Sequence, residues 1–251
     1  MKKSFAVMFL SFLVAGFLHA EVLLDETFDD ASGKLTPGKT LKRVNLVTVA
    51  PGQGAIGEDP AAHFLDDSAD EAGMMEYNVE KAGAFFISFD VLNSLPAAEA
   101  GSRLNFGMGQ ANEGKSTMLG SNAKRAFSVE FEQIASKGVV IRVGPTSVQK
   151  IAYDGAALQQ VKIWVNDNDT TELSYIRPDT KAPAKLGPDS VVVWINDKLV
   201  GKEEAIGTPM KTAESALSVG DAVLGRLGFV SKSSDTTDFW IDNLHVESVS
   251  P

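Results

Sequence analysis

The feature that most constrains the fold of this chain is a recurring pattern of short segments in which apolar residues alternate with polar ones or form brief apolar runs. Glycine, proline, asparagine and aspartate separate these segments, as in residues 136–138 and 196–198. Such a pattern predicts many short β-strands. Short links favour antiparallel pairing, and about a dozen strands in one domain form two packed sheets or a barrel.

The predicted strands share this period of two and are bounded by turn residues. They cover residues 22–28, 41–49, 62–65, 74–79, 84–92, 103–108, 126–133, 139–143, 161–165, 171–175, 190–195, 224–230 and 238–246. One short helix is expected at 208–219, and the segments 51–60 and 177–188 are expected to be surface loops because they are rich in Gly, Pro and Asp. The fold class predicted from this pattern is all-β, a two-sheet antiparallel jelly-roll sandwich.

The first residues form a typical secretory signal peptide. Lys2 and Lys3 precede an apolar run over residues 5–18, which ends at the small residue Ala20. We expect cleavage after Ala20, so that residues 1–20 are removed and residues 21–251 form one domain in a secreted or periplasmic protein. The chain has no cysteine, so its stability must come from burial of apolar surface, with a bound metal as the other possible source.

The charge of the chain excludes some partners. Asp and Glu number 33 against 23 Lys and Arg, a formal net charge of -10. Such a surface repels nucleic acid and anionic membranes, because phosphate binding needs clustered Lys and Arg. No membrane insertion is expected after signal cleavage. Cations and neutral ligands remain compatible with this charge.

The three tryptophans occur in one local setting. Trp164, Trp194 and Trp240 each lie two residues before an Asn or Asp near the predicted end of a strand. Because alternate residues of a strand share a face, the ring and the polar group project to the same side.

Several segments together resemble the concanavalin A-like lectin and glucanase jelly rolls, in the LamG-like form found in exported bacterial proteins. The segments that carry the resemblance are 24–30 (LDETFDD), 86–90 (FISFD), 161–166 (VKIWVN), 193–200 (VWINDKLV), 227–229 (LGF) and 239–246 (FWIDNLHV). The resemblance implies two stacked antiparallel sheets, a concave face that often holds a glycan, and sometimes a structural calcium ion.

Two carboxylates are the only catalytic candidates. Glu130 and Glu132 are two residues apart on one predicted strand, so they share a face, as the acid pair of a glycoside hydrolase requires. The hydrolases that this segment resembles carry a third acid at the position of Ala135, which is absent here. Lyases of the same architecture carry the sequence Gln-Ile-His on one strand. Here Gln133 and Ile134 are followed by Ala135, so the histidine is absent. The alternative is that both glutamates simply belong to a solvated strand face.

The tryptophans are the candidates for binding. Trp164 and Asn166 share one face of their strand, Trp194 and Asn196 share one face of theirs, and the aliphatic neighbours of Trp164 point the other way. Sugar rings stack on aromatic planes while amides bind their hydroxyl groups. The alternative is that both rings pack against a further layer of the protein.

A calcium site is the one candidate for a cofactor. Glu26, Asp29 and Asp30 lie at the predicted first strand and Asp242 at the last, and terminal strands are often neighbours in this architecture. The alternative is that Asp242 caps the end of a strand and the other three carboxylates are merely exposed.

The sequence therefore predicts a non-catalytic carbohydrate-binding, lectin-like domain that holds a saccharide or polysaccharide through Trp164 and Trp194. Two alternatives stay open. One is a glycan-cleaving enzyme, a hydrolase or lyase, that uses Glu130 and Glu132. The other is a structural envelope-associated module without a small ligand.

Overall fold

The structure is a computed structural model that describes residues 20–28, 40–42, 45–48, 61–66, 73–93, 103–110, 125–134, 138–143, 147–150, 157–200, 224–231 and 237–250. The predicted signal peptide up to residue 19, the predicted helix at 208–219 and the predicted loop at 51–60 lie outside these residues. No helix within the described ranges is long and apolar enough to cross a membrane.

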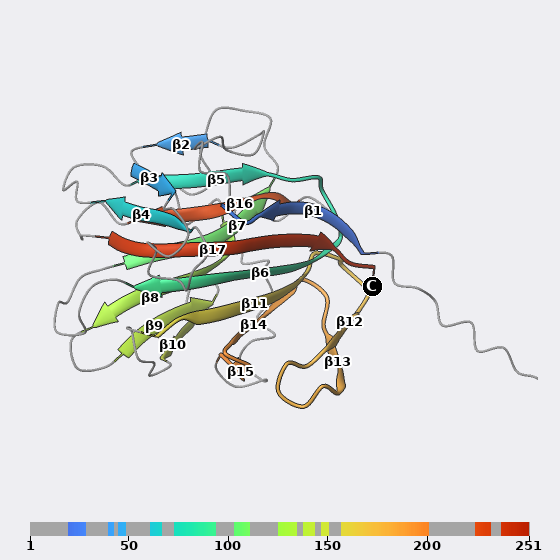
Figure 1. Cartoon of the computed structure of the whole chain (residues 1–251). Coiled ribbons are helices and arrows are strands. Elements are labelled where there is room, and N and C mark those ends of the chain that lie inside the picture. Colours follow the sequence, from blue (N-terminus) through green and yellow to red (C-terminus); the bar gives the residue numbers. More distant parts are fainter. Residues whose placement is uncertain are drawn as a thin grey trace, which may run out of the picture.

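Two antiparallel sheets form the body of the molecule (Figure 1). The eight-stranded sheet contains β15 (Lys198–Leu199), β14 (Ser190–Ile195), β11 (Gln159–Asn166), β6 (Ala84–Asn93), β17 (Thr237–Ser248), β4 (Ala62–Asp66) and β3 (Asn45–Thr48), in this order, with β1 (Glu21–Glu26) also paired to β17. The seven-stranded sheet runs β10 (Ser147–Lys150), β9 (Gly138–Val143), β8 (Arg125–Ile134), β7 (Arg103–Gln110), β16 (Leu224–Ser231), β5 (Met74–Asn78) and β2 (Thr40–Lys42). The prediction of a two-sheet antiparallel jelly roll is confirmed.

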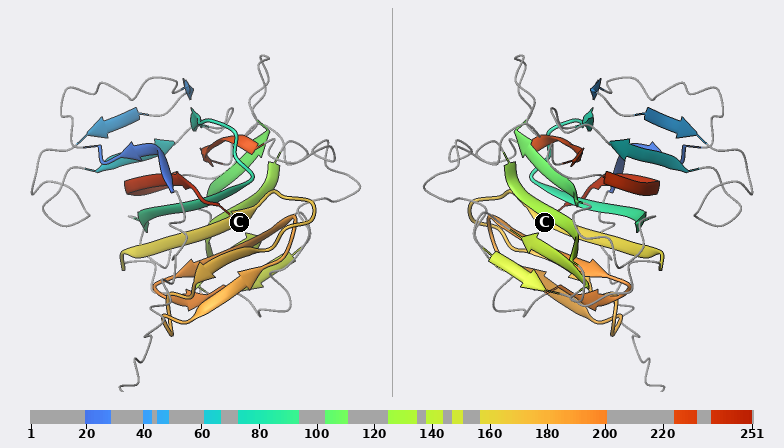
Figure 2. Two further views of the ribbon diagram at one scale, coloured as in Figure 1. Left: turned by 90° about the vertical axis from the view of Figure 1, so that its right-hand side faces the viewer. Right: turned by 90° about the vertical axis from the view of Figure 1, so that its left-hand side faces the viewer.

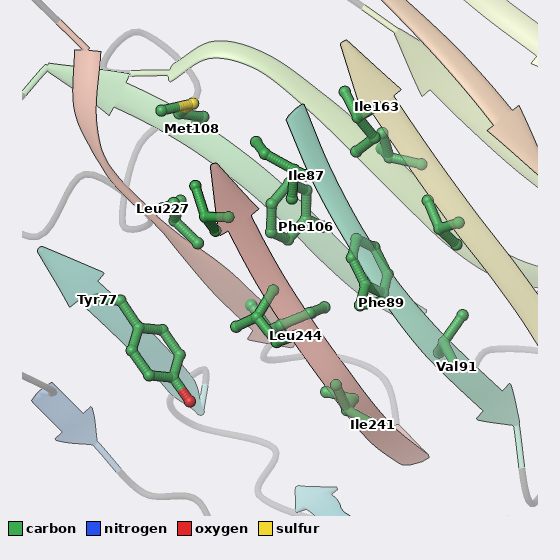
Figure 3. Packing of buried hydrophobic residues seen from close by; sticks show 14 of the residues in the cluster. Tyr77, Ile87, Phe89, Val91, Phe106, Met108, Ile163, Leu227, Ile241 and Leu244 are labelled. Atoms are coloured by element: carbon green, nitrogen blue, oxygen red, sulfur yellow. The ribbon is translucent and has the colours of Figure 1, made fainter. Parts of the chain in front are cut away.

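The core lies between the two sheets. Phe89, Phe106, Leu227 and Leu244 point toward one another from β6, β7, β16 and β17 (Figure 3). Phe89 lies 4.9 Å from Phe106 and 5.1 Å from Phe229 between ring centroids. Because side chains alternate along each strand, these buried residues define the inner faces of both sheets, and their sequence neighbours lie on the outer faces.

A hairpin lies outside both sheets. Strands β12 (Leu173–Ile176) and β13 (Pro183–Leu186) pair only with each other and cover the outer face of β14 and β11 (Figures 1 and 2). The prediction that 177–188 is a surface loop is wrong for β13. Its apolar Leu186 pairs with Leu173, and both are buried against the eight-stranded sheet.

Strand β17 joins the first and last parts of the chain. One edge pairs with β6, while the other pairs first with β4 and then, from Leu244 onward, with β1. The register slips between Asp242 and His245, where Asn243 has φ 52°, the geometry of a β-bulge. The expectation that the N-terminal and C-terminal strands are neighbours is confirmed.

Candidate functional site

The hairpin covers one of the two tryptophans that the sequence predicts to bind a sugar. Val161, Ile163 and Val165 are in the core, so Trp164 does face outward from β11, as predicted. Trp194 faces outward from β14 but has 0% exposure, because Leu173, Tyr175 and Leu186 of the hairpin cover it. The guanidinium of Arg177 lies over the Trp194 ring, 5.3 Å from its centroid. With the hairpin in this position, the Trp194 ring contacts protein and cannot stack on a sugar.

The asparagines predicted to accompany these rings hold turns. Asn166 is fully buried, and its Nδ2 donates to the carbonyl oxygens of Thr171, Leu186 and Gly187, at 2.8, 3.3 and 2.9 Å. Asn196 is exposed at a turn, where its own φ is 49°. Its side-chain Oδ1 accepts a hydrogen bond from the backbone amide of Gln160 at 2.8 Å. Asn166 therefore fastens both ends of the β12–β13 hairpin.

The tip of the hairpin is held by charges. Arg177 donates to Asp179 through Nε and Nη2, at 3.0 and 2.9 Å, and these hydrogen bonds lower the pKa of Asp179 to about 2. Asp197, in the turn before β15, accepts from Lys162 at 2.8 Å, which lowers the pKa of Asp197, and lies 3.8 Å from Lys181 of the tip.

The structure separates the carboxylates predicted to bind calcium. Glu26 pairs in register with Leu244, a core residue, and is 9% exposed. Asp242 pairs with Asp90, whose neighbours Phe89 and Val91 face the core. Paired residues share a face, so Glu26 and Asp242 lie on opposite faces of the sheet. Asp29 and Asp30 lie outside the described residues, and within the described part of the chain no three His, Cys, Asp or Glu side chains form a metal-binding group.

Glu26 instead belongs to the core. Its Oε1 accepts a hydrogen bond from the Phe28 amide at 3.3 Å. Burial raises the pKa of the Tyr77 hydroxyl, and the negative charge of Glu26 raises it further. These two groups face each other between the sheets.

Among the residues that the structure describes, buried charged side chains gather on the outer face of the seven-stranded sheet. Val129 and Phe131 face the core, so Glu130 points outward, and it is only 6% exposed. The side chain of Glu132 is outside the described part of the structure, so its place beside Glu130 stays a prediction from strand alternation. Glu130 pairs in register with Asn105 of β7, and Glu132 pairs with Arg103.

Two glycines form the middle of this face. Gly228 of β16 pairs with Gly107 of β7, so two neighbouring positions carry no side chain. A Cβ at Gly107 would lie 3.0 Å from Cδ of Arg125, which places the Arg125 side chain over this glycine. Gly228 has φ 154°, and a Cβ there would overlap the carbonyl oxygen of Met75. Only glycine fits this position.

Paired charges surround the glycines. Arg226 Nε lies 3.4 Å from Oε1 of Glu76, which is 4% exposed, and donates to Oδ1 of Asn78 at 2.8 Å. Burial lowers the pKa of Arg125 to about 10, and the charge of Glu130 opposes this effect. We call the outward-facing residues Glu76, Asn78, Arg103, Asn105, Arg125, Ser128, Glu130 and Arg226 the polar strip.

The polar strip can form many directed hydrogen bonds. Charged groups away from the core are usually solvated, because burying them costs several kcal/mol unless they are paired. Buried, paired charges with a shifted pKa are therefore candidates for a functional site. Sequence reasoning identified Glu130 here but missed Glu76, Asn105 and Arg226, which come from three other strands.

A histidine on the opposite sheet is held by two carboxylates. His245 of β17 lies 3.2 Å from Asp25 through Nδ1 and 2.9 Å from Glu247 through Nε2. Burial by itself would lower the pKa of His245, but the hydrogen bonds and charges of Glu247 and Asp25 outweigh it and raise the pKa. Asp25 lies on β1, so His245, when protonated, ties the first strand to the last.

The contribution of His245 to stability is expected to fall as pH rises. Its pKa in the folded chain lies above the usual 6.5, so the stabilisation is complete below pH 6.5 and is lost as pH rises through the folded-state pKa. Urea denaturation between about pH 6 and pH 8 should show a decline in the free energy of unfolding that is smaller in His245→Gln. Identical pH dependence of the two proteins would contradict this assignment.

Solved structures resemble the fold of this chain, although sequence comparison finds no match. No protein-family model matches the sequence, and no curated protein matches it. A solved structure described as a sialidase has a TM-score of 0.55 and 11% identity, covering 90% of this chain and 18% of that one. A carbohydrate esterase from the Shiga toxin-encoding bacteriophage phi24B also has a TM-score of 0.55, with 15% identity over 92% of this chain and 100% of that one.

A third similar structure is the carbohydrate recognition domain of Emp46p in its potassium-bound form. Its TM-score is 0.52 and its identity 11%, covering 88% of this chain and 95% of that domain. These likenesses establish the fold: the chain is a concanavalin A-like jelly roll. It spans about a fifth of the sialidase but nearly all of the other two chains.

Proposed function

We propose that this chain is a secreted, non-catalytic carbohydrate-binding domain that holds a saccharide on the polar strip. The observation that carries the proposal is the set of buried, paired charges around Gly107 and Gly228 on a face that does not belong to the core. Carboxylates, amides and guanidinium groups are the partners that sugar hydroxyls need. The names of the three similar structures, which all concern carbohydrates, support this ligand class.

Secretion is part of the proposal and rests on the amino-terminal sequence. Strand β1 begins at Glu21, directly after the expected cleavage site at Ala20. Removal of residues 1–20 would therefore leave the strand that pairs with β17 intact.

Binding is expected to depend on Asn105. This amide is 9% exposed, lies beside Glu130 and carries no charge, so Asn105→Ala removes hydrogen-bonding capacity without leaving a buried charge unpaired. On a glycan array followed by calorimetry, we expect about a tenfold or greater loss of affinity for the saccharide that the wild type selects, since one hydrogen bond to a ligand is worth about 1.4 kcal/mol. Lys185→Ala, on the exposed side of β13, is the matched control and should bind like the wild type.

The same preparation tests for catalysis. A pair of carboxylates at Glu130 and Glu132 would cleave glycosidic bonds, so the purified wild type and Glu130→Gln should be incubated with a panel of polysaccharides and the reducing ends measured. A binding domain releases none with either protein. Cleavage by the wild type that disappears in Glu130→Gln would replace this proposal with the hydrolase alternative. If the wild type binds no saccharide, the remaining alternative is a structural envelope-associated module without a small ligand.

A further inference from the structure

The outer face of the eight-stranded sheet carries partly exposed aromatic rings at two separate places. On β6 and β11, Phe86 and Trp164 pair in register with ring centroids 4.9 Å apart. On β4 and β17, His63 and Trp240 pair in register and stack nearly parallel, 4.2 Å apart with an interplanar angle of 6°. All four side chains are partly accessible, in contrast to the buried Trp194. Trp164 also contacts Tyr175 of the hairpin, with ring centroids 5.0 Å apart, so the hairpin covers part of its ring.

The two aromatic pairs lie on one continuous surface. Trp240 pairs with Leu92 of β6, six residues from Phe86 on the same strand, which corresponds to about 20 Å at the rise of an extended chain. Ser88 and Asp90 lie between them on β6, and His245 and Asn243 lie beside these on β17. Asn243 Nδ2 donates to Asp90 Oδ2 at 2.9 Å. We call this surface, from Trp164 to Trp240, the aromatic-ended face.

The charges of this face select among ligands. Within the described residues, its carboxylates are Asp25, Asp90, Asp238, Asp242 and Glu247. Lys162 also lies on it and is engaged by Asp197. Arg177, over the neighbouring Trp194, is bonded to Asp179, and no other arginine of the described residues lies on the outer face of this sheet. An acidic surface repels polysaccharides that carry carboxylates or sulfates. Carboxylates and amides still accept and donate hydrogen bonds to neutral hydroxyl groups.

We infer that the aromatic-ended face is a second carbohydrate-binding surface, which takes a linear neutral polysaccharide chain. Sugar rings stack at Trp164 and at Trp240, and the hydroxyl groups between them bind to Asp90 and Asn243. The inference relies on the proposed function only for the class of ligand, since the residues lie on the sheet opposite the polar strip. A domain with both surfaces would bind two stretches of polysaccharide at once.

The test is affinity electrophoresis in native gels that contain soluble neutral polysaccharides, namely mixed-linkage β-glucan, xylan and galactomannan, with polygalacturonate as the acidic comparison. We expect at least one neutral polymer, and not polygalacturonate, to retard the wild type. Trp164→Ala and Trp240→Ala should each weaken the retardation about tenfold, because loss of one stacked ring costs about 1.4 kcal/mol. Trp164→Phe keeps an aromatic plane and should retain most of the binding, which separates loss of stacking from loss of folding.

The outcomes distinguish the two surfaces. If the tryptophan variants lose binding while Asn105→Ala keeps it, the aromatic-ended face is a ligand site and the polar strip is not the one that binds these polymers. If Asn105→Ala alone abolishes retardation and Trp164→Ala does not change it, the second surface is refuted and the proposed function stands. Retardation only by polygalacturonate, or by none of the four polymers, also overturns the inference.

Discussion

Replacing Trp194 with alanine is expected to lower the free energy of unfolding by about 3–5 kcal/mol, the cost of emptying a fully buried aromatic site. The indole is 0% exposed and is the largest side chain of the small apolar cluster under the hairpin. Its loss removes both the packing beneath Leu173 and Leu186 and the contact with the Arg177 guanidinium. Urea denaturation followed by circular dichroism measures the change.

Two variants serve as controls for this expectation. Trp164→Ala removes a partly exposed ring and should cost less, about 1–3 kcal/mol. Lys185→Ala removes an ion pair with Glu172 on the exposed side of the same hairpin and should change stability by less than about 1 kcal/mol. A Trp194→Ala protein as stable as Lys185→Ala would mean that the hairpin does not cover this ring in solution, and Trp194 would again be a candidate for stacking on a sugar.

Asn166→Asp is expected to destabilise the chain by about 3–5 kcal/mol, although it changes the size of the side chain very little. The substitution replaces the Nδ2 donor with an oxygen that faces the carbonyl oxygens of Thr171 and Gly187, at 2.8 and 2.9 Å. A buried acceptor then opposes other acceptors, because the partners described for Asn166 Nδ2 are all carbonyl oxygens, and none of these offsets a negative charge. The midpoint of thermal unfolding and the free energy from urea denaturation should both fall.

The matched control for this variant is Asn196→Asp, the same chemical change at an exposed turn. Its Oδ1 acceptor for the backbone amide of Gln160 is retained. It loses one hydrogen bond, from Nδ2 to Oε1 of Gln159, which the Gln159 amide can replace by turning its nitrogen toward the new oxygen, so the expected loss is below about 1 kcal/mol. Limited proteolysis gives a second readout, because release of the hairpin exposes the 177–182 turn to cleavage. Equal stability of Asn166→Asp and Asn196→Asp would show that Asn166 does not fasten the hairpin.

The alternation of side chains explains how much of the fold was predictable. Most strands lie where the period of two placed them, and Val161, Ile163 and Val165 face the core as expected. The predicted strand at 41–49 is instead two strands, β2 and β3, in different sheets. Periodicity shows which residues share a face but not which strand is the neighbour. Strand β13 was missed because Pro183 and the preceding polar residues resemble a loop.

The candidate site was less predictable, because it depends on contacts distant in sequence. The prediction that Trp194 faces away from the sandwich core is confirmed, but no local pattern shows that a hairpin covers it. Glu130 was singled out from its spacing to Glu132, whereas Asn105 and Arg226 join it only through strand pairing. The local signals at these positions were a polar residue between buried apolar neighbours and glycines at 107 and 228 within strands.

Strand β17 also has a consequence for the order in which this protein can fold. It is the last strand of the chain, yet it lies inside the eight-stranded sheet, with β6 on one edge and β4 and β1 on the other. Its pairing with β1 joins residues more than two hundred positions apart, as in Asp25 and His245. Contacts at such separation make folding slow. Without β17, β6 has no neighbour that connects it to β4 and β1, so the eight-stranded sheet cannot be completed until this late segment of the sequence is available.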